Sequence, residues 1–292
     1  MKNVYREKSM EDVLDTVILG DCLSVLPEIP SESVDLTVFS PPYDGIRDYK
    51  GEWKFNFTEL GHEIYRVSKE GAMACVVIGD GTKNFAKSLT SFRLAVDWCD
   101  HSKWRLFECC IYRRDGNPGA WWNSRFRVDH EYILMFLKGS RPKHFVKDHL
   151  MVPSKHAGKI YSGTDRLTNG GFKTIAPKPV NPMKCRGTVW TYATSNTEGN
   201  KIKLKHPATF PDLLAEDLIR CFSAPGQIVL DPMCGSGTTC IVANKYNRHF
   251  IGIDISSEYC EIAKKRIDYE CANIQQMLCE GSEPYVPKTR HP

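Results

Sequence analysis

Val34-Asp35-Leu36-Thr37-Val38-Phe39-Ser40-Pro41-Pro42-Tyr43 indicates a strand that ends in a rigid turn. Its first six residues are mainly apolar and β-branched, which predicts a buried strand. The double proline cannot continue that strand, because proline lacks the N–H that a ladder needs. In an open α/β sheet, ligands bind beyond the carboxyl ends of strands. The stretch therefore places two groups for a substrate, the Ser40 hydroxyl and the Tyr43 ring, although a plain turn with a surface tyrosine fits equally well.

A second stretch, Asp231-Pro232-Met233-Cys234-Gly235-Ser236-Gly237-Thr238-Thr239, follows the short apolar strand 227–230 and precedes a helical pattern. Two glycines between strand and helix let the backbone approach a ligand closely, and the helix N-terminus offers free N–H groups. A third strand, residues 249–253, ends in Asp254. Nucleoside-binding sheets place the acceptor for the ribose hydroxyls about 20 residues beyond such a glycine loop. The spacing therefore predicts a nucleoside-containing ligand.

Together these stretches resemble the amino-methylating DNA methyltransferases, which use S-adenosylmethionine (S-adenosyl-L-methionine) as cofactor. Ser-Pro-Pro-Tyr is similar to their catalytic motif and residues 231–237 to their cofactor loop, with the catalytic motif first, as in the β class of that family. One position departs from the family, since Met233 stands where phenylalanine is usual. The resemblance implies that the catalytic residues are Ser40, Pro41, Pro42 and Tyr43. It implies that the cofactor-binding residues are Asp21, Asp231, Pro232, Met233, Gly235, Ser236, Gly237, Thr238 and Asp254.

The resemblance also implies the fold class. We expect an α/β, Rossmann-like S-adenosylmethionine-dependent methyltransferase fold, with a mostly parallel seven-stranded sheet, an antiparallel edge strand and a basic target-recognition insert. The expected domains are a catalytic half, residues 1–140, the DNA-binding insert, 141–205, and a cofactor-binding half, 206–292. Periodicity predicts helices and strands in agreement with this plan. The helices are residues 58–67, 212–222 and 258–269, and the strands are 71–79 and an antiparallel pair, 104–112 and 132–137.

Charge is concentrated in one part of the chain. Residues 141–205 hold 13 Lys and Arg against 3 Asp and Glu, an excess of +10, whereas the whole chain of 292 residues carries +4. A strongly basic insert on a scaffold that is otherwise net acidic is typical of a nucleic-acid surface. The alternative interpretation is a solvated, partly disordered linker.

A loop near residues 113–125 mixes arginines with tryptophans, a combination that suits phosphates and unstacked bases. Alternatively, the tryptophans belong to the core and the arginines are solvated. We predict double-stranded DNA as the partner. The expected contacts are Arg113, Arg114, Trp121, Trp122, Arg125, Lys201, Lys203 and Lys205.

The composition excludes several classes of protein. It contains 41% hydrophobic and 25% charged residues, without an apolar run of the roughly 20 residues that a membrane span needs. The twelve cysteines are scattered and show no Cys-x-x-Cys spacing, which argues against zinc and against a disulfide framework. We therefore expect no metal, no membrane and no signal peptide, and a cytoplasmic protein held at the nucleoid through DNA.

Ser40 bears on which base is methylated. The first motif position in the resembled family is commonly Asp or Asn in adenine-N6 enzymes and Ser in cytosine-N4 enzymes, so the resemblance implies cytosine-N4. A hydroxyl can accept from the amine and donate to a ring nitrogen, whereas a carboxylate only accepts. Adenine offers a comparable ring nitrogen, so the chemistry leaves adenine-N6 open. In either case the base must be flipped out of the duplex.

Other functions remain compatible with the sequence. One is methylation of RNA or a small molecule on the same fold, and another is a DNA-binding protein without turnover. The basic insert argues against a small-molecule substrate, and the intact motif with Asp254 argues against an inactive protein. The recognised DNA site, a homodimer and a separate cognate restriction endonuclease are left open by the sequence.

Overall fold

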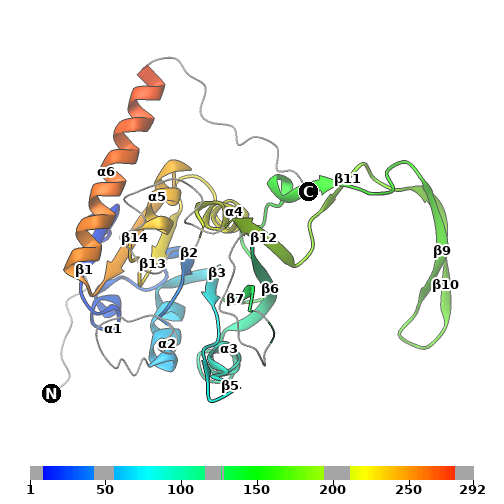
Figure 1. Ribbon diagram of the computed structural model, residues 1–292, viewed down its shortest axis with the longest axis horizontal. Helices are drawn as coiled ribbons and strands as arrows, with labels where there is room; N and C mark the ends of the chain where they lie inside the picture. The colour runs from blue at the N-terminus through cyan, green and yellow to red at the C-terminus, as the bar shows by residue number, and fades with distance from the viewer. Residues whose placement is uncertain (1–8, 43–55, 116–125, 127, 194–210, 280–292) are drawn as a thin grey trace. The chain divides into compact units, whose positions relative to one another are not determined.

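The computed structural model describes residues 9–42, 56–115, 126, 128–193 and 211–279 (Figure 1). The chain divides into two compact units. Among the described residues, the smaller unit comprises Lys147–Gly187 and the larger unit comprises the rest. The smaller unit lies within the expected insert, residues 141–205, and is shorter than it.

The larger unit is built on a sheet in the order β1-β14-β13-β2-β3-β7-β6-β12. Every neighbouring pair is parallel except for the two that include β7, which runs against both β3 and β6. The strands are β1 (Thr16–Leu19), β2 (Val34–Phe39), β3 (Ser68–Ile78), β6 (Arg105–Asp115), β7 (His130–Leu137), β12 (Val189–Ala193), β13 (Ile228–Asp231) and β14 (His249–Asp254).

The α/β class and the mainly parallel sheet are confirmed, with two differences in detail. The sheet has eight strands in the described chain where seven were expected, and the antiparallel strand β7 lies inside it rather than at its edge. Both differences come from β12, which pairs with β6 and forms the edge. Its residues alternate between exposed and buried, as an edge strand with one covered face does. The antiparallel pairing of β6 with β7 is confirmed.

Helices cover both faces of the sheet (Figure 1). On one face, Leu60 and Ile64 of α2 pack with Trp98 of α3 against strand residues such as Phe39 and Phe136. On the other face, α4 packs on α5 and α5 packs on α6. The first layer consists of α1 (Cys22–Val25), α2 (Phe57–Val67) and α3 (Thr90–His101); the second consists of α4 (Asp212–Phe222), α5 (Thr238–Lys245) and α6 (Ser257–Cys279). Because β2 lies between the layers, all six of its residues are buried.

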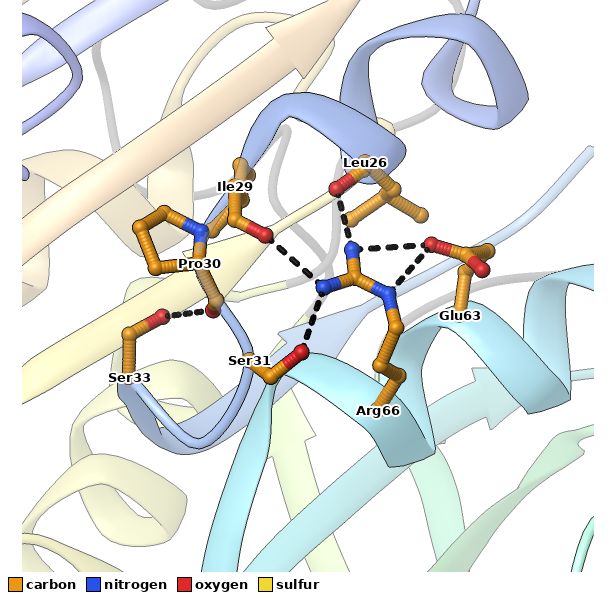
Figure 2. Close-up of polar contacts among 7 residues, drawn as sticks. All are labelled: Leu26, Ile29, Pro30, Ser31, Ser33, Glu63 and Arg66. Carbon is orange, nitrogen blue, oxygen red and sulfur yellow. Dashed lines mark hydrogen bonds and ion pairs between the residues drawn. The ribbon is translucent and has the colours of Figure 1, made fainter. Parts of the chain in front are cut away.

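The segment that leads into β2 is fixed by Arg66 of α2 (Figure 2). Its guanidinium donates to the carbonyl oxygens of Leu26 (2.7 Å) and Ile29 (2.9 Å) and to the Ser31 hydroxyl (3.0 Å). It also pairs with Glu63 one turn earlier, at 2.9 Å. Leu26 begins the short 3-10 helix η2 (Leu26–Glu28), and its carbonyl also accepts from the Ile29 N–H at 2.9 Å, so the arginine adds a second donor there and supplies one to the Ile29 carbonyl at the end of the turn. The clamp sets where β2 begins, and hence where its carboxyl end emerges.

The smaller unit consists of two short antiparallel pairs. β8 (Met151–Pro153), which follows the 3-10 turn η3 (Asp148–Leu150), pairs with β11 (Met183–Cys185). β9 (Ile160–Arg166) pairs with β10 (Phe172–Pro179). The unit carries eight Lys and Arg against two Asp. Its chain forms defined hairpins, which does not fit the alternative of a disordered linker.

Two further observations concern the described residues only. The helices include none that is long and apolar enough to cross a membrane. Side chains of His, Cys, Asp and Glu do not gather in groups that could hold a metal ion in this part of the chain.

A two-stranded hairpin of β4 (Thr82–Lys83) and β5 (Ala86–Lys87) precedes α3, and the turn η1 (Met10–Asp12) precedes β1.

Candidate cofactor and substrate site

The two sequence motifs meet at one edge of the sheet. β13 pairs in parallel with β2, with Leu230 opposite Thr37, so both strands end at the same edge. The chain leaves β2 toward β3 on one side and leaves β13 toward β14 on the other, so the strand order reverses between them. Such a reversal is where open α/β sheets bind their ligands. Ser40 and Asp231, far apart in sequence, are therefore placed at the same edge of the sheet.

The glycine loop after β13 is held by hydrogen bonds that its backbone N–H groups donate. The Met233 N–H donates to Asp231 Oδ1 (3.0 Å), and the Gly237 N–H donates to the Cys234 carbonyl (2.7 Å). Gly235 has φ +50° and Gly237 has φ +79°, in the left-handed region that favours glycine. A Cβ at Gly237 would lie 2.9 Å from the Cβ of Ala263 on α6. The loop can therefore lie close against α6 only because this position is glycine.

Asp254 ends β14 and holds the loop in place. Its Oδ2 accepts from the Gly235 N–H at 2.8 Å, and its Oδ1 accepts from the Ser256 N–H at 2.9 Å. Burial raises the pKa of this carboxyl, and the two N–H donors oppose that shift. Each carboxylate oxygen has a second lone pair. Asp254 can therefore accept hydroxyl donors from a ligand while it keeps both backbone contacts.

Asp231 and Thr239 connect the loop to β2. Asp231 is 2% exposed, and burial raises its pKa to about 7, against the opposing effects of the Thr239 hydroxyl and the Met233 N–H. The Thr239 hydroxyl also lies within hydrogen-bond distance of the Val38 carbonyl oxygen (3.2 Å), so its single hydrogen serves either Val38 or Asp231. Val38 lies two residues before Ser40, so one side chain of α5 joins the glycine loop to the strand that carries the serine. The sequence motif includes Thr239, but its contact with Val38 depends on the tertiary fold and was not anticipated.

The end of β1 adds polar and apolar groups to this edge. The Gly20 N–H donates to the Asp254 carbonyl (2.9 Å), and Asp21 is exposed while its Oδ1 caps α1 through the Leu23 N–H (3.0 Å). Leu19, the last residue of β1, is 56% exposed, and Ile255, which directly follows β14, is 51% exposed. Sequence reasoning did not single out these two residues. Apolar side chains next to Asp21 and Asp254 suit the flat face of a nucleobase.

The other predicted residues differ in how far the structure describes them. Pro41 is buried, whereas Ser40 and Pro42 are half-buried at the end of β2. Arg113 is exposed on β6, while the Arg114 guanidinium donates to the Val128 carbonyl (3.0 Å) and pairs with Glu131 (3.5 Å). Arg114 thus has structural partners. Outside the described residues lie Tyr43, Trp121, Trp122, Arg125, Lys201, Lys203 and Lys205.

The residues present fit S-adenosylmethionine. Asp254 offers acceptors for ribose hydroxyls, Leu19 and Ile255 offer apolar surface for adenine, and the two glycines of the loop carry no Cβ to keep a ligand away from its backbone. The exposed carboxylate of Asp21 suits a ligand that carries positive charge. The edge of the sheet therefore contains the hydrogen-bond acceptors, the negative charge and the apolar surface that suit a positively charged nucleoside.

Comparisons with known proteins point to the same chemistry. The family described as DNA methylase, covering N6 and N4 enzymes, matches residues 34–265. The orphan methyltransferase M.BamHII of Bacillus amyloliquefaciens is 36% identical over 85% of this chain and 90% of its own. The DNA adenine methyltransferase YhdJ of Escherichia coli is 29% identical over 87% of this chain and 82% of its own. The solved PvuII DNA methyltransferase (cytosine-N4-specific) has a TM-score of 0.64 at 20% identity, covering 92% and 95% of the two chains, and shares the fold.

Proposed function

Because the chain belongs to the N6/N4 DNA methylase family, we propose that it methylates the N4 amine of a cytosine at a specific sequence in duplex DNA. S-adenosylmethionine is the methyl donor of this family. The observation that carries the proposal is the meeting of Ser40 and the glycine loop at the strand-order reversal, with Thr239 joined to Val38. The neighbouring carboxyl ends of β2 and β13 bring a donor site and a substrate site together.

The cofactor site comprises the glycine loop, Asp21 and Asp254. Asp254 accepts from the ribose hydroxyls, and Asp21 lies near the adenine. The bound cofactor supplies an electrophilic methyl group on a sulfonium. The hydrogen bonds of Gly235 to Asp254 (2.8 Å) and of Thr239 to Val38 (3.2 Å) would hold the cofactor-binding loop beside the end of β2. The remaining cofactor-binding residues are Asp231, Pro232, Met233, Ser236, Gly237 and Thr238.

The substrate site is the Ser-Pro-Pro-Tyr segment. An exocyclic amine is a poor nucleophile because its lone pair is delocalised into the ring, so it has to be oriented with its protons bound to acceptors. The Ser40 hydroxyl and the Pro41 carbonyl supply those acceptors. Tyr43 stacks on the flipped base, which recovers about 1–3 kcal/mol and offsets the cost of unstacking. Methyl transfer is then an in-line displacement that depends mainly on positioning.

Ser40 favours cytosine through its ability to accept from the amine and to donate to the neighbouring ring nitrogen, N3. The second candidate is adenine-N6, with N1 as the corresponding nitrogen. It is favoured by the 29% identity to a DNA adenine methyltransferase. The hydroxyl suits both bases, so the volume of the base pocket must also help to discriminate cytosine from adenine. We place cytosine first because a serine, rather than Asp or Asn, begins the motif.

Methyl transfer from radiolabelled S-adenosylmethionine tests the proposal. The purified chain should label a duplex DNA library and leave an RNA library of matched sequence unlabelled. Ser40→Ala should lower the labelling of DNA and leave cofactor affinity unchanged, because Ser40 contacts the base and not the donor. Preferential labelling of RNA would overturn DNA as the substrate, and no labelling of either polymer would overturn the proposed activity.

A further inference from the structure

The β9–β10 hairpin has no covering layer within its own unit. Every residue of β9 is exposed except Gly163, and every residue of β10 is exposed except Ile175, and both of these are half-buried. Phe172 is 70% exposed. An isolated two-stranded hairpin is only marginally stable in water. A ribbon of seven and eight residues that is open on both faces is therefore suited to contact with a partner.

The register of the ribbon separates its side chains into two faces. Thr164 lies opposite Thr174, and Arg166 lies opposite Phe172, so these four share one face. The other face carries the pairs Asp165 with Lys173 and Tyr161 with Lys178. The first face thus presents two hydroxyls, a guanidinium and an aromatic ring, whereas the second presents two ammonium groups, the Asp165 carboxylate opposite Lys173, and the Tyr161 ring.

Charge and size both match duplex DNA. The ribbon and the residue before it hold Lys159, Arg166, Lys173 and Lys178 against the single acid Asp165. The major groove of B-DNA is about 12 Å wide and admits a two-stranded ribbon, whose strands lie about 4.8 Å apart. The deep groove of an RNA helix is too narrow for side-chain readout. The face with hydroxyls also carries the groups that recognise base edges, since Arg binds guanine, and Thr and Phe contact bases or the thymine methyl group.

We propose that the β9–β10 ribbon enters the major groove at the target site, with Thr164, Arg166, Phe172 and Thr174 toward the base edges. Lys173 and Lys178, on the opposite face, bind phosphates. This inference rests on the proposed function, because it identifies the element that chooses the DNA sequence. It assigns sequence choice to hydroxyl and guanidinium groups, and salt-dependent affinity to the lysines.

The test maps methylated sites in a randomised duplex library. The double variant Thr164→Val, Thr174→Val keeps the β-branched shape and removes both hydroxyls. At one or two adjacent positions of the site, it should lower the preference for the favoured base over the other bases by about tenfold. Thr191→Val, an exposed threonine of β12, is the matched control and should keep the wild-type profile. Lys173→Gln with Lys178→Gln should reduce the salt dependence of DNA affinity and leave the profile unchanged.

A second variant removes the ribbon. The Val180 N–H donates to the Lys159 carbonyl at 2.9 Å, so an Asn-Gly turn can replace residues 160–179. The shortened chain should bind cofactor like wild type and lose its preference for one site. An unchanged site profile in both the double variant and the shortened chain would overturn the inference. A second result would also overturn it. If wild type is a dimer, and the variants become monomers but keep the wild-type site profile, the ribbon binds a second copy of the chain rather than DNA. If wild type methylates no DNA, the proposed function has failed instead.

Discussion

Asp254 has a structural role and a proposed cofactor-binding role, and a substitution can distinguish the two. Its carboxylate holds the backbone of Gly235 and Ser256, and we propose that it also accepts from the cofactor ribose. Asp254→Asn keeps the size of the side chain but removes the charge and one acceptor oxygen. We expect cofactor affinity, measured by calorimetry, to fall by about tenfold or more, the range for hydrogen bonds to a charged group.

Asp268→Asn on the exposed side of α6 is the matched control, because it removes the same charge away from the site. It should leave both cofactor affinity and Tm unchanged. If Asp254→Asn lowers Tm but binds cofactor like wild type, the carboxylate has only a structural role.

Thr239 tests whether the glycine loop and β2 act as one site. Thr239→Val removes the hydroxyl that contacts Val38 and should lower kcat for DNA methylation, together with about 1 kcal/mol of stability. Thr239→Ser keeps the hydroxyl and should restore kcat. Thr37→Val is the control. The Thr37 hydroxyl, in β2, is as buried as that of Thr239 but has no hydrogen-bond partner. A loss of kcat that Thr239→Ser fails to restore would argue against this positioning role.

Sequence reasoning could propose site residues only where chemistry and position coincide along the chain. Asp254 ends a strand and Ser40 precedes two prolines, so each is visible in a short window. Leu19 and Ile255 look like ordinary strand neighbours, and their exposure follows from where the sheet ends. The Thr239 contact joins two segments that only the sheet brings together, so no local pattern could reveal it.

At the scale of elements, the close packing of the glycine loop on α6 can be tested with a pair of glycines. Gly237 and Gly226 share φ +79°, but a Cβ at Gly237 meets Ala263, while a Cβ at Gly226 meets nothing within 4 Å. Gly226→Ala should cost only the left-handed backbone penalty, about 1–2 kcal/mol. Gly237→Ala should cost more and also weaken cofactor binding, because α6 or the loop must move. Equal losses of stability with unchanged cofactor affinity would contradict this account of the loop.

Most elements with a covered face were predicted, whereas the strands β9 and β10, which lack one, were not. The helix expected at 58–67 is α2, and its apolar residues Leu60, Ile64 and Val67 form the buried stripe that made it visible. β9 and β10 are exposed on both faces, so they lack the alternation by which strands are recognised. β12 does alternate, but it is only five residues long and lies among Gly, Pro and Lys.

At the scale of the whole molecule, charge and chemistry occupy different parts of the chain. The unit of residues 147–187 is strongly basic, whereas the sheet unit supplies the acidic and glycine-rich site. An enzyme that acts on DNA needs both a basic surface and a reaction site. Phosphate contacts supply affinity, and the residues at the ends of β2 and β13 are proposed to carry out the reaction. The order of the sheet strands explains how motifs at residues 40 and 231 form one site.

The identity of the methylated nucleoside tests the central claim most directly. Duplex DNA is incubated with the purified chain and S-adenosylmethionine, digested to nucleosides, and analysed by mass spectrometry. The account predicts N4-methylcytosine, absent when the cofactor is omitted. N6-methyladenine without N4-methylcytosine would contradict the choice of base, and 5-methylcytosine, or no methylated nucleoside, would contradict amino-methylation of DNA altogether.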